Sequence, residues 1–299
     1  MIKLGTRKSP LALIEAEIVK RELLKRDPSL SIQIIPIMTS GDQDKSTPLS
    51  EIGGKGIFIK SLEKALLTGT IDIAIHSLKD VTSQLEEGLE LSAFLEPEAI
   101  EDCIIFHPKH KTLKLESLPK KAKIGTGSLR RKALIKQTMP KADCIDIRGN
   151  VQTRIKKLES ENLDAIILSY CGLIRLGLEN KVSLILDAEE FIPAPGQGVI
   201  VLETRKEDKL SKHTALLINS KIQEKISQLE YHFLSEIGLN CGYPLGLYTR
   251  YKNKQFNIQL FLSNEEGTLQ YEEDITTNEH EAYDLLMSKA KEYKKQLRK

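Results

Sequence analysis

The sequence predicts an α/β protein with two similar doubly wound lobes, followed by a C-terminal α+β domain with a three-stranded antiparallel sheet. Three observations support this fold class. Short apolar runs alternate with helical patterns over the first two-thirds of the chain, which is typical of a mostly parallel sheet covered by helices. The alternation restarts near residue 123. After Cys241 the pattern changes to closely spaced strands separated by turn residues.

The first lobe opens with a strand and a capped helix. Ile2–Thr6 is the predicted strand, and Ser9 is the predicted N-cap, with Pro10 at the first helical position. A polar loop at Thr39–Gly56 interrupts the lobe. The remaining predicted elements are a strand at Ser31–Met38, a helix at Ile57–Leu67 and strands at Ile71–Ile75 and Leu89–Phe94.

The second lobe repeats this order. Its predicted elements are strands at Lys123–Thr126, Cys144–Ile147 and Ala165–Leu168 and helices at Ser128–Thr138 and Asn150–Ser160. Both lobes open with Gly-Thr followed by a capping serine, Ser9 in one and Ser128 in the other. We interpret this as a weak internal repeat. Ligands of such lobes bind where strands end and helices begin, so two facing lobes predict a binding cleft.

A stiff crossover at Pro193–Gly198 leads back to strand character at Val199–Glu203. The elements predicted after it are a helical stretch at Lys206–Ile237, strands at Leu245–Tyr251, Phe256–Leu262 and Leu269–Ile275, and a charged helix at Glu279–Arg298. The predicted domains are residues 1–95 with 196–217, residues 99–192, and residues 220–299.

Composition argues against several classes of protein. The net charge is +2 and aromatic residues make up 5%, which disfavours a nucleic-acid-binding surface or a base-stacking platform. No apolar run approaches the roughly 20 residues that span a bilayer, and the N-terminal residues lack the apolar core of a signal peptide. We therefore expect a cytoplasmic protein without membrane contact. The four cysteines show no C-x-x-C spacing, so neither a metal site nor a disulfide framework is expected.

Arginine is unevenly distributed. Only 11 of the 44 basic residues are arginine, and five of them fall in one short region: Arg130, Arg131, Arg148, Arg154 and Arg175. Three lie where helices are predicted to begin, where the helix dipole disfavours a cation. This placement indicates a bound anion, because helix N-termini and arginine forks both favour carboxylate or phosphate. The alternative is a set of ordinary solvated arginines.

Asp80 is the candidate catalytic carboxylate. The sequence His76-Ser77-Leu78-Lys79-Asp80 follows a buried strand, which is the usual place for function in an α/β sheet. A carboxylate fixed in a cleft stabilises a cation that develops during a reaction. A solvated loop, or a helix cap at Asp80, remains the alternative. His76 taken alone is more typical of a packing histidine.

Two further segments carry candidate chemistry. Gly53-Gly54-Lys55-Gly56 has the conformational freedom of a lid or an anion nest, although the segment alone favours a flexible surface turn. Cys241 lies in a turn with Gly242 and Pro244, whereas the other cysteines adjoin apolar runs. Cys241 is therefore the candidate for a reactive or modified thiol.

These motifs together resemble the hydroxymethylbilane synthase, or porphobilinogen deaminase, family from end to end. The matching segments are Thr6–Leu13, Gly53–Phe58, His76–Val81, Gly125–Arg131, Arg148–Arg154, Asp164–Leu168, Gly172–Gly177, Pro193–Gly198 and Cys241. The resemblance implies three domains, with two lobes of the type II periplasmic-binding-protein form. It also implies a monomeric transferase of haem biosynthesis that condenses four porphobilinogen molecules, with loss of ammonia, into hydroxymethylbilane.

The resemblance assigns roles residue by residue. Cys241 would carry a covalent dipyrromethane cofactor through a thioether, and Asp80, with Lys79, would be catalytic. Cofactor contacts are implied for Ser9, Lys79, Asp80, Thr126, Ser128, Arg130, Arg131 and Arg148. Substrate contacts are implied for Arg7, Arg148, Arg154, Arg175 and Phe58, and the arginines would neutralise the acetate and propionate groups of the growing chain.

The chain departs from the family pattern at Thr82, at Gly127 and at Leu239-Asn240, and it lacks an arginine within Glu96–Asp102. Two other functions remain open at this point. One is a two-lobed, non-catalytic protein that binds a small anion. The other is a degenerate relative that binds tetrapyrroles without making them.

Overall fold

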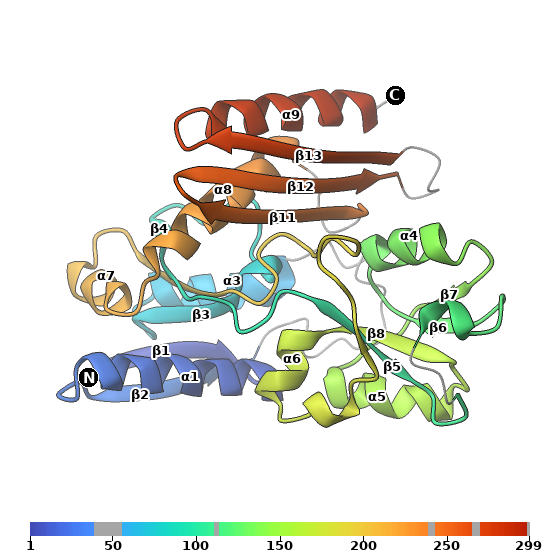
Figure 1. Cartoon of the computed structure of the whole chain (residues 1–299). Coiled ribbons are helices and arrows are strands. Elements are labelled where there is room, and N and C mark those ends of the chain that lie inside the picture. The colour runs from blue at the N-terminus through green and yellow to red at the C-terminus, as the bar shows by residue number, and fades with distance from the viewer. Residues whose placement is uncertain (39–55, 111–113, 239–242, 265–269, 298–299) are drawn as a thin grey trace. The chain divides into compact units, whose positions relative to one another are not determined.

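The computed structural model describes residues 1–38, 56–110, 114–238, 243–264 and 270–297. Within these residues the chain divides into two compact units. The first unit holds strands β1–β4 and β10 with helices α1, α3, α7, α8 and α9, and the second unit holds the other strands and helices (Figure 1). The three-domain division expected from the sequence stays a prediction.

The sheet of the first unit has the strand order β2-β1-β3-β10-β4. Its strands are β1 (Ile2–Arg7), β2 (Ile32–Ile37), β3 (Ile73–Ser77), β4 (Leu89–Phe94) and β10 (Ile200–Arg205). Strand β1 pairs parallel with β2 and β3, whereas β10 runs antiparallel to β3 and β4. The parallel trio therefore places the carboxyl ends of β1 and β3 at one edge of the sheet.

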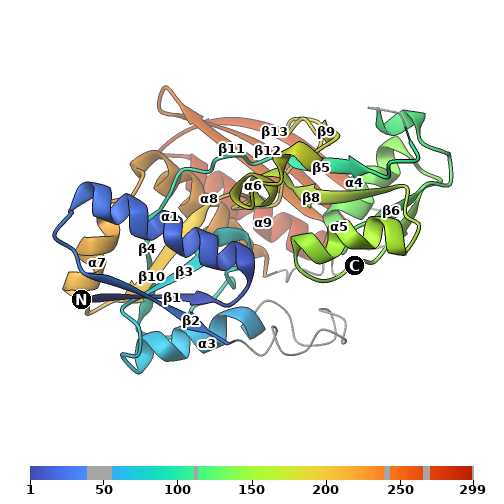
Figure 2. The same cartoon turned by 90° about the horizontal axis from the view of Figure 1, so that it is seen from below.

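Helices α1 (Pro10–Arg26) and α3 (Gly56–Leu67) cover opposite faces of this sheet (Figure 2). Val19 of α1 packs with Ile73 and Ile75, while Leu62 of α3 packs with Ala74 between them. This alternation follows from the two-residue period of a strand, which turns successive side chains to opposite faces. Strand β3 is thus buried on both faces and holds the turn after it rigidly.

The sheet of the second unit has the order β7-β6-β8-β5-β9. Its strands are β5 (Asp102–Phe106), β6 (Lys123–Gly125), β7 (Asp143–Ile145), β8 (Ala165–Ser169) and β9 (Leu184–Ile185). Strand β6 pairs parallel with β7 and β8, and β5 runs antiparallel to β8. The same arrangement of three parallel strands beside an antiparallel one occurs in both units, which confirms the internal repeat and the two doubly wound lobes.

Three helices cover the second sheet: α4 (Leu129–Thr138), α5 (Val151–Ser160) and α6 (Tyr170–Arg175). Leu158 of α5 and Leu173 of α6 pack on one face with Ile166. Ile135 of α4 packs on the other face with Ile167. Both faces are therefore apolar, as expected for a mostly parallel sheet.

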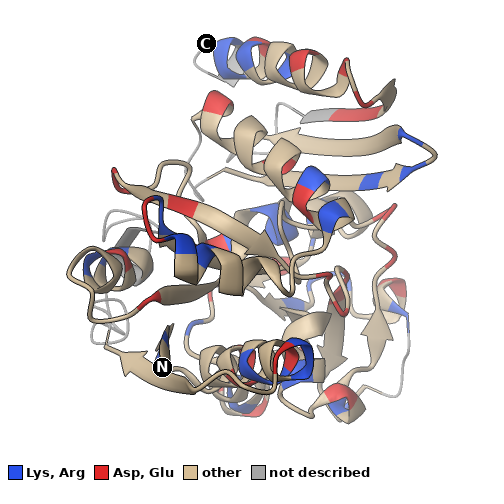
Figure 3. Ribbon diagram, turned by 90° about the vertical axis from the view of Figure 1, so that its left-hand side faces the viewer, with Lys and Arg blue, Asp and Glu red and all other residues tan. Residues whose placement is uncertain are grey.

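The C-terminal part holds a three-stranded sheet with the order β11-β12-β13. Its strands are β11 (Leu245–Lys252), β12 (Gln255–Ser263) and β13 (Gln270–Asn278), and the neighbouring helices in sequence are α7 (Lys209–Leu216), α8 (Lys221–Ile237) and α9 (Ala282–Leu297). Strands β11 and β12 pair antiparallel throughout, as expected. Helix α9 carries charges of both signs along its length (Figure 3).

Two sequence-based assignments were wrong in detail. The single helical stretch expected at Lys206–Ile237 is two helices, because Asn219 accepts a hydrogen bond from the Phe94 amide and Ser220 caps α8. The strand expected at Ile71–Ile75 begins at Ile73 and continues to Ser77. His76 therefore lies within a strand and not after one. Strands β5 and β9 and helix α6 were not predicted.

Candidate functional site

Two pairs of predicted site residues follow the carboxyl ends of neighbouring strands in the first unit. Arg7 is the last residue of β1, and Ser9 caps α1. Strand β3 ends at Ser77 and leads into a 3-10 turn that contains Lys79 and Asp80. Because β1 and β3 are parallel neighbours, these residues lie along one edge of the sheet.

Short-range hydrogen bonds fix the first of these segments. Ser9 Oγ accepts from the Ala12 amide at 3.3 Å, and Thr6 Oγ1 donates to the Ala12 carbonyl at 2.9 Å. Thr6 is fully buried, and Pro10 occupies the start of the helix. The N-cap predicted from the sequence is confirmed, and it orients the backbone immediately after Arg7.

The turn with Lys79 and Asp80 is anchored by its apolar residues. Leu78 and Val81 are buried, whereas Lys79 and Asp80 are half-buried. The Val81 amide donates to the Leu78 carbonyl at 3.0 Å and so closes the turn. An acid and a base are therefore presented at the strand end on a backbone that the core holds in place.

His76 and Ser77 precede this turn and meet buried carboxylates. His76 Nε2 lies 2.9 Å from Glu203 Oε2, and both residues are buried. Ser77 Oγ lies 2.9 and 3.0 Å from the two carboxylate oxygens of Glu15. The interpretation of His76 as a packing histidine with a hydrogen-bond partner is confirmed. Neither glutamate was predicted, although both occupy helix or strand positions that otherwise favour apolar residues.

In the second unit the predicted polar residues also follow strand ends. Thr126 and Ser128 come directly after β6, and Ser128 Oγ caps α4 by accepting from the Arg131 amide at 3.4 Å. Arg148 follows β7, and Asn150 caps α5 by accepting from the Thr153 amide at 2.8 Å. Both predicted caps are confirmed. Each turn places a strand end beside a helix N-terminus, as an anion site requires.

Arg154 and Arg175 lie further from these strand ends. Arg154 belongs to α5, and its Nε donates to the Gly149 carbonyl at 2.8 Å. Arg175 is the last residue of α6, where the helix dipole favours a cation. Both side chains are half-buried. Arg175 therefore lies at a helix end and not at a helix start.

Arg130 and Arg131 form a buried cluster around Asp102. Arg130 Nη2 lies 2.7 Å from Asp102 Oδ2, and Arg131 Nη2 lies 2.8 Å from Asp102 Oδ1. Gln197 donates its amide to the same Oδ1 atom at 2.9 Å and to the Ile100 carbonyl at 2.7 Å. The sequence predicted an anion at these arginines, and the chain itself supplies one in Asp102. Sequence reasoning missed both Asp102 and Gln197.

The electrostatics of this cluster leave a surplus of positive charge. Burial opposes ionisation of Asp102, but Arg130 and Arg131 together hold the pKa of its carboxyl well below the ordinary value. One carboxylate then balances two guanidiniums. The remaining Nη1 atoms donate to the carbonyls of Ile192 and Ile167. Nε of each arginine is buried and has no partner among the described residues.

The neighbouring thiol of Cys103 lies in surroundings that disfavour the thiolate. Burial, with a further contribution from the Asp102 charge, raises the pKa of Cys103 to about 12. Cys144 is half-buried, and burial raises its pKa as well. Cys241, together with Gly53, Gly54 and Lys55, lies outside the described residues, and the side chain of Phe58 does too.

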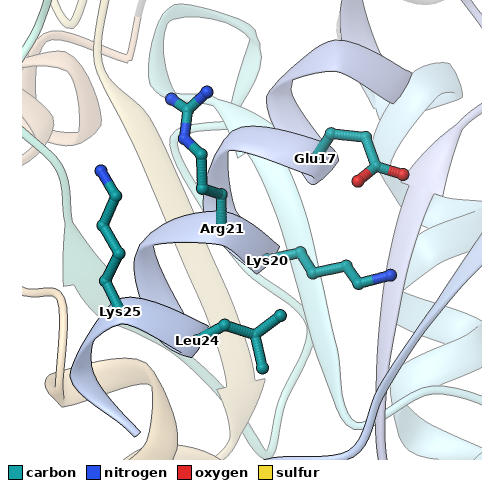
Figure 4. Close-up of a pocket in the computed structure, with 5 residues that line it drawn as sticks. All are labelled: Glu17, Lys20, Arg21, Leu24 and Lys25. Carbon is teal, nitrogen blue, oxygen red and sulfur yellow. The ribbon is translucent and has the colours of Figure 1, made fainter. Parts of the chain in front are cut away.

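A shallow hollow on α1 contains none of the predicted site residues. It is lined by Glu17, Lys20, Arg21, Leu24 and Lys25 (Figure 4). All five belong to one helix, so the hollow reflects the spacing of side chains on a solvated face. Across the described ranges, no three His, Cys, Asp or Glu side chains gather in a way that suits a metal ion. Nor does any helix there have the length and apolar character that crossing a membrane demands.

Comparison with known proteins identifies the family. Residues 2–213 match the family model described as "Porphobilinogen deaminase, dipyromethane cofactor binding domain". The porphobilinogen deaminase of Chlorobium luteolum is 39% identical over 297 residues, which cover 98% of this chain and 94% of that protein. The chain belongs to the porphobilinogen deaminase family. The Geobacter metallireducens member is 38% identical over 275 residues, covering 92% of this chain and 85% of that one.

Among solved structures, a YaeC-family lipoprotein from Enterococcus faecalis is similar to this chain with a TM-score of 0.45 at 15% identity. The match covers 77% of this chain and 96% of that one.

The residues of this porphobilinogen deaminase family member fit the anionic cofactor that the family model names. A dipyrromethane brings several carboxylates, and the cluster of Arg130, Arg131 and Asp102 retains one uncompensated positive charge. Two buried Nε–H donors there have no partner among the described residues. A donor set that combines surplus charge with unused N–H groups suits carboxylate ligands.

Proposed function

We propose that the chain is a hydroxymethylbilane synthase, a transferase that joins four porphobilinogen molecules on a covalently bound dipyrromethane primer. Membership of the porphobilinogen deaminase family supports the reaction class. The structural observation that carries the proposal is the turn after β3, which presents a half-buried Asp80 beside Lys79 at the functional edge of a buried sheet. A carboxylate so placed suits a reaction that passes through a cation.

Asp80 is the proposed catalytic residue. Each addition breaks the C–N bond of a porphobilinogen aminomethyl group and releases ammonia, which leaves positive charge on the pyrrole. A new C–C bond then forms to the free α-carbon of the growing chain, and that carbon loses a proton. The Asp80 carboxylate stabilises the charge and accepts a hydrogen bond from the pyrrole N–H, which is the electrostatic help this step needs. Lys79 binds the cofactor beside it.

The arginines and the capping turns are proposed to bind carboxylates. Every pyrrole unit carries an acetate and a propionate, so the growing chain is a polyanion. Arginine forks grip such groups bidentately, which favours arginine over lysine here. The proposed substrate-binding residues are Arg7, Arg148, Arg154, Arg175 and Phe58. The proposed cofactor-binding residues are Ser9, Lys79, Asp80, Thr126, Ser128, Arg130, Arg131 and Arg148.

Cys241 is the proposed attachment point of the cofactor. A dipyrromethane bound there supplies the free pyrrole α-carbon to which the first substrate is joined. Arg130 and Arg131 hold its carboxylates through the surplus charge that Asp102 leaves uncompensated. We also propose that the protein is cytoplasmic and monomeric, as the family resemblance implies. Gel filtration of the purified protein tests the monomeric state.

Intact-mass spectrometry of the purified protein tests the proposal. We expect a mass increase of two pyrrole units on protein from a host that makes porphobilinogen, and its loss in Cys241→Ala. Cys144→Ala is the matched control. Cys144 is a half-buried free thiol and is not the proposed attachment point, so this variant should keep the adduct. Porphobilinogen consumption with release of hydroxymethylbilane provides the activity readout. A bare polypeptide mass together with no turnover would exclude the synthase.

A further inference from the structure

The end of β3 is held from both faces of its sheet by buried carboxylates. His76 bonds Glu203 of β10 on the face that α3 covers, and Ser77 bonds Glu15 of α1 on the opposite face. Glu203 is 0% exposed and Glu15 is 3% exposed. The next residue, Leu78, donates its amide to the Val199 carbonyl at 2.9 Å. The turn that carries Asp80 therefore begins at a clamped strand end.

The pair of His76 and Glu203 is costly for the fold. Oε2 of Glu203 meets His76, but Oε1 is buried with no hydrogen-bond partner among the described residues. Glu63 of α3 and Tyr231 of α8 are close enough for their pKa values to be raised by the Glu203 charge, in addition to the larger effect of burial. His76 acts on Glu63 in the opposite direction, so the His76–Glu203 pair is the polar contact at this place in the core. Replacing a buried polar pair of this kind by apolar residues is often neutral or stabilising.

The pair is also placed where β10 changes its pairing. Strand β10 shifts register against β4 between Leu202 and Glu203, and such bulges re-aim side chains and occur beside active sites. On its other edge β10 pairs with β3, with Val201 opposite His76. Glu203 therefore reaches the His76 ring diagonally, across the two strands. The contact ties the lateral position of the β3 end to the neighbouring strand β10.

We propose that Glu203 is a positioning residue for the reaction and acts through His76. Its carboxylate accepts the Nε2–H of His76 and so fixes the β3 end and the turn from Leu78 to Asp80. This inference rests on the proposed role of Asp80. A catalytic carboxylate that shifts by about 1 Å loses roughly a hundredfold in rate, so a tether at His76, two residues before the turn, governs kcat. The residues proposed to bind the substrate carboxylates, Arg7, Arg148, Arg154 and Arg175, lie outside this turn, so substrate affinity should change little.

A double variant separates positioning from stability. Glu203→Leu alone leaves His76 without its partner and is expected to lower the melting temperature. Glu203→Leu combined with His76→Leu replaces a buried polar pair by apolar side chains, a change that is often neutral or stabilising. We expect the double variant to regain stability, while kcat stays about 10- to 100-fold below wild type and KM stays within about twofold.

The matched control is Thr204→Val. Thr204 is the next residue of β10, fully buried, and its hydroxyl lies 2.6 Å from that of Ser92 on β4. The substitution removes a buried hydrogen bond of the same strand without touching the β3 end, so kcat should not change.

The conservative variant is Glu203→Gln. Its side chain keeps an acceptor for His76 Nε2–H, so this variant should retain most of the wild-type kcat that Glu203→Leu loses. Recovery of kcat in the double variant, in step with its stability, would overturn the proposal.

Hydrogen exchange provides a readout that does not depend on activity. The amides of Leu78 and Val81 are hydrogen-bonded at the start and the end of the turn. We expect both to exchange faster in the double variant and at wild-type rates in Thr204→Val. Unchanged exchange in the double variant would refute the tether even if the wild type proved inactive. If the wild type is inactive but the Leu78 and Val81 amides exchange faster in the double variant, the proposed function is refuted and the tether is not.

Discussion

Asp102 Oδ2 lies 2.7 Å from Arg130 Nη2, and the two residues are 0% and 4% exposed. The other oxygen of the same carboxylate meets Arg131 at 2.8 Å. Asp102 begins β5, whereas both arginines lie in the first turn of α4. A single carboxylate thus holds two guanidiniums in the buried centre of the second unit.

Asp102→Asn should destabilise the protein strongly. The side chain keeps its shape but loses its charge, which leaves two buried guanidiniums without a counter-ion. Breaking a buried ion pair from one side costs about 3–5 kcal/mol. Urea denaturation of the variant and the wild type measures the free energy of unfolding.

The control for this change is Asp146→Asn. Asp146 pairs with Lys132 at 2.7 Å, but its side chain is 72% exposed. Exposed pairs contribute about 0–1 kcal/mol. Equal losses in Asp102→Asn and Asp146→Asn would show that the buried cluster is not a stabilising centre.

The arginine cluster was predicted only in part from the sequence. Cations in a first helical turn indicate a bound anion, and the anion that the structure shows at Arg130 and Arg131 is Asp102 of the chain itself. Sequence alone does not distinguish a carboxylate of the ligand from one of the chain. Asp102 lies 28 and 29 residues before the arginines, and only the folded sheet brings them together. Their part in cofactor binding stays a prediction.

Local patterns predicted elements whose residues carry their own start and stop signals. The caps Ser9, Ser128 and Asn150 were found because each precedes a helix with the right residue type. Strand β5 was missed although it is as long as β3 and β8, because it opens with Asp102, whose burial depends on partners distant in sequence. The break between α7 and α8 was missed because Asn219 is recruited by β4, far away in sequence.

The candidate site, too, contains residues that the sequence predicted and residues that it did not. Lys79 and Asp80 were predicted because they follow a strong apolar strand, and the structure places them in a turn at its end. Glu15 and Glu203 support that turn. Nothing in the sequence distinguishes these two residues from solvated glutamates on a helix or a strand. Their burial depends on the packing of β3 against α1, α3 and β10.

Glu63→Gln should stabilise the protein in a pH-dependent manner. Burial, and then the charges of Glu203 and Glu86, raise the pKa of Glu63 above the ordinary 4.5. The folded state therefore binds the proton more tightly than the unfolded state. The stability that this proton provides is complete below pH 4.5 and is lost as pH rises through the folded pKa.

Glutamine keeps the oxygen that accepts from the Glu86 amide, at 3.2 Å, and carries no charge. The variant should therefore melt at a higher temperature than wild type at pH 7–8. This difference should shrink towards pH 4. Calorimetry across this range measures it. A melting-temperature difference that stays constant with pH would contradict the buried-charge explanation.

Asp80→Asn should abolish turnover and leave the fold intact. The amide occupies the volume of the carboxylate but does not balance a developing cation. Losses of about 10²- to 10⁴-fold are typical when a proton-transferring or charge-stabilising group is removed. Porphobilinogen consumption measures the rate, and circular dichroism checks the fold. Glu87→Gln, an exposed change in the following loop, is the control. Near-normal rates in Asp80→Asn would remove this residue from the mechanism.

Arg148→Lys should stall elongation. The substitution keeps the positive charge after β7 but replaces a planar fork by a point charge, so bidentate contact with a carboxylate is lost. Each added pyrrole brings two more carboxylates, so the deficit should grow with chain length. Enzyme-bound chains of intermediate length should then accumulate in mass spectra taken during turnover. Arg21→Lys is the matched control, because Arg21 lies on the solvated face of α1 with its side chain 62% exposed. If both variants release product at the wild-type rate with the same bound species, charge alone suffices at position 148 and the fork is dispensable.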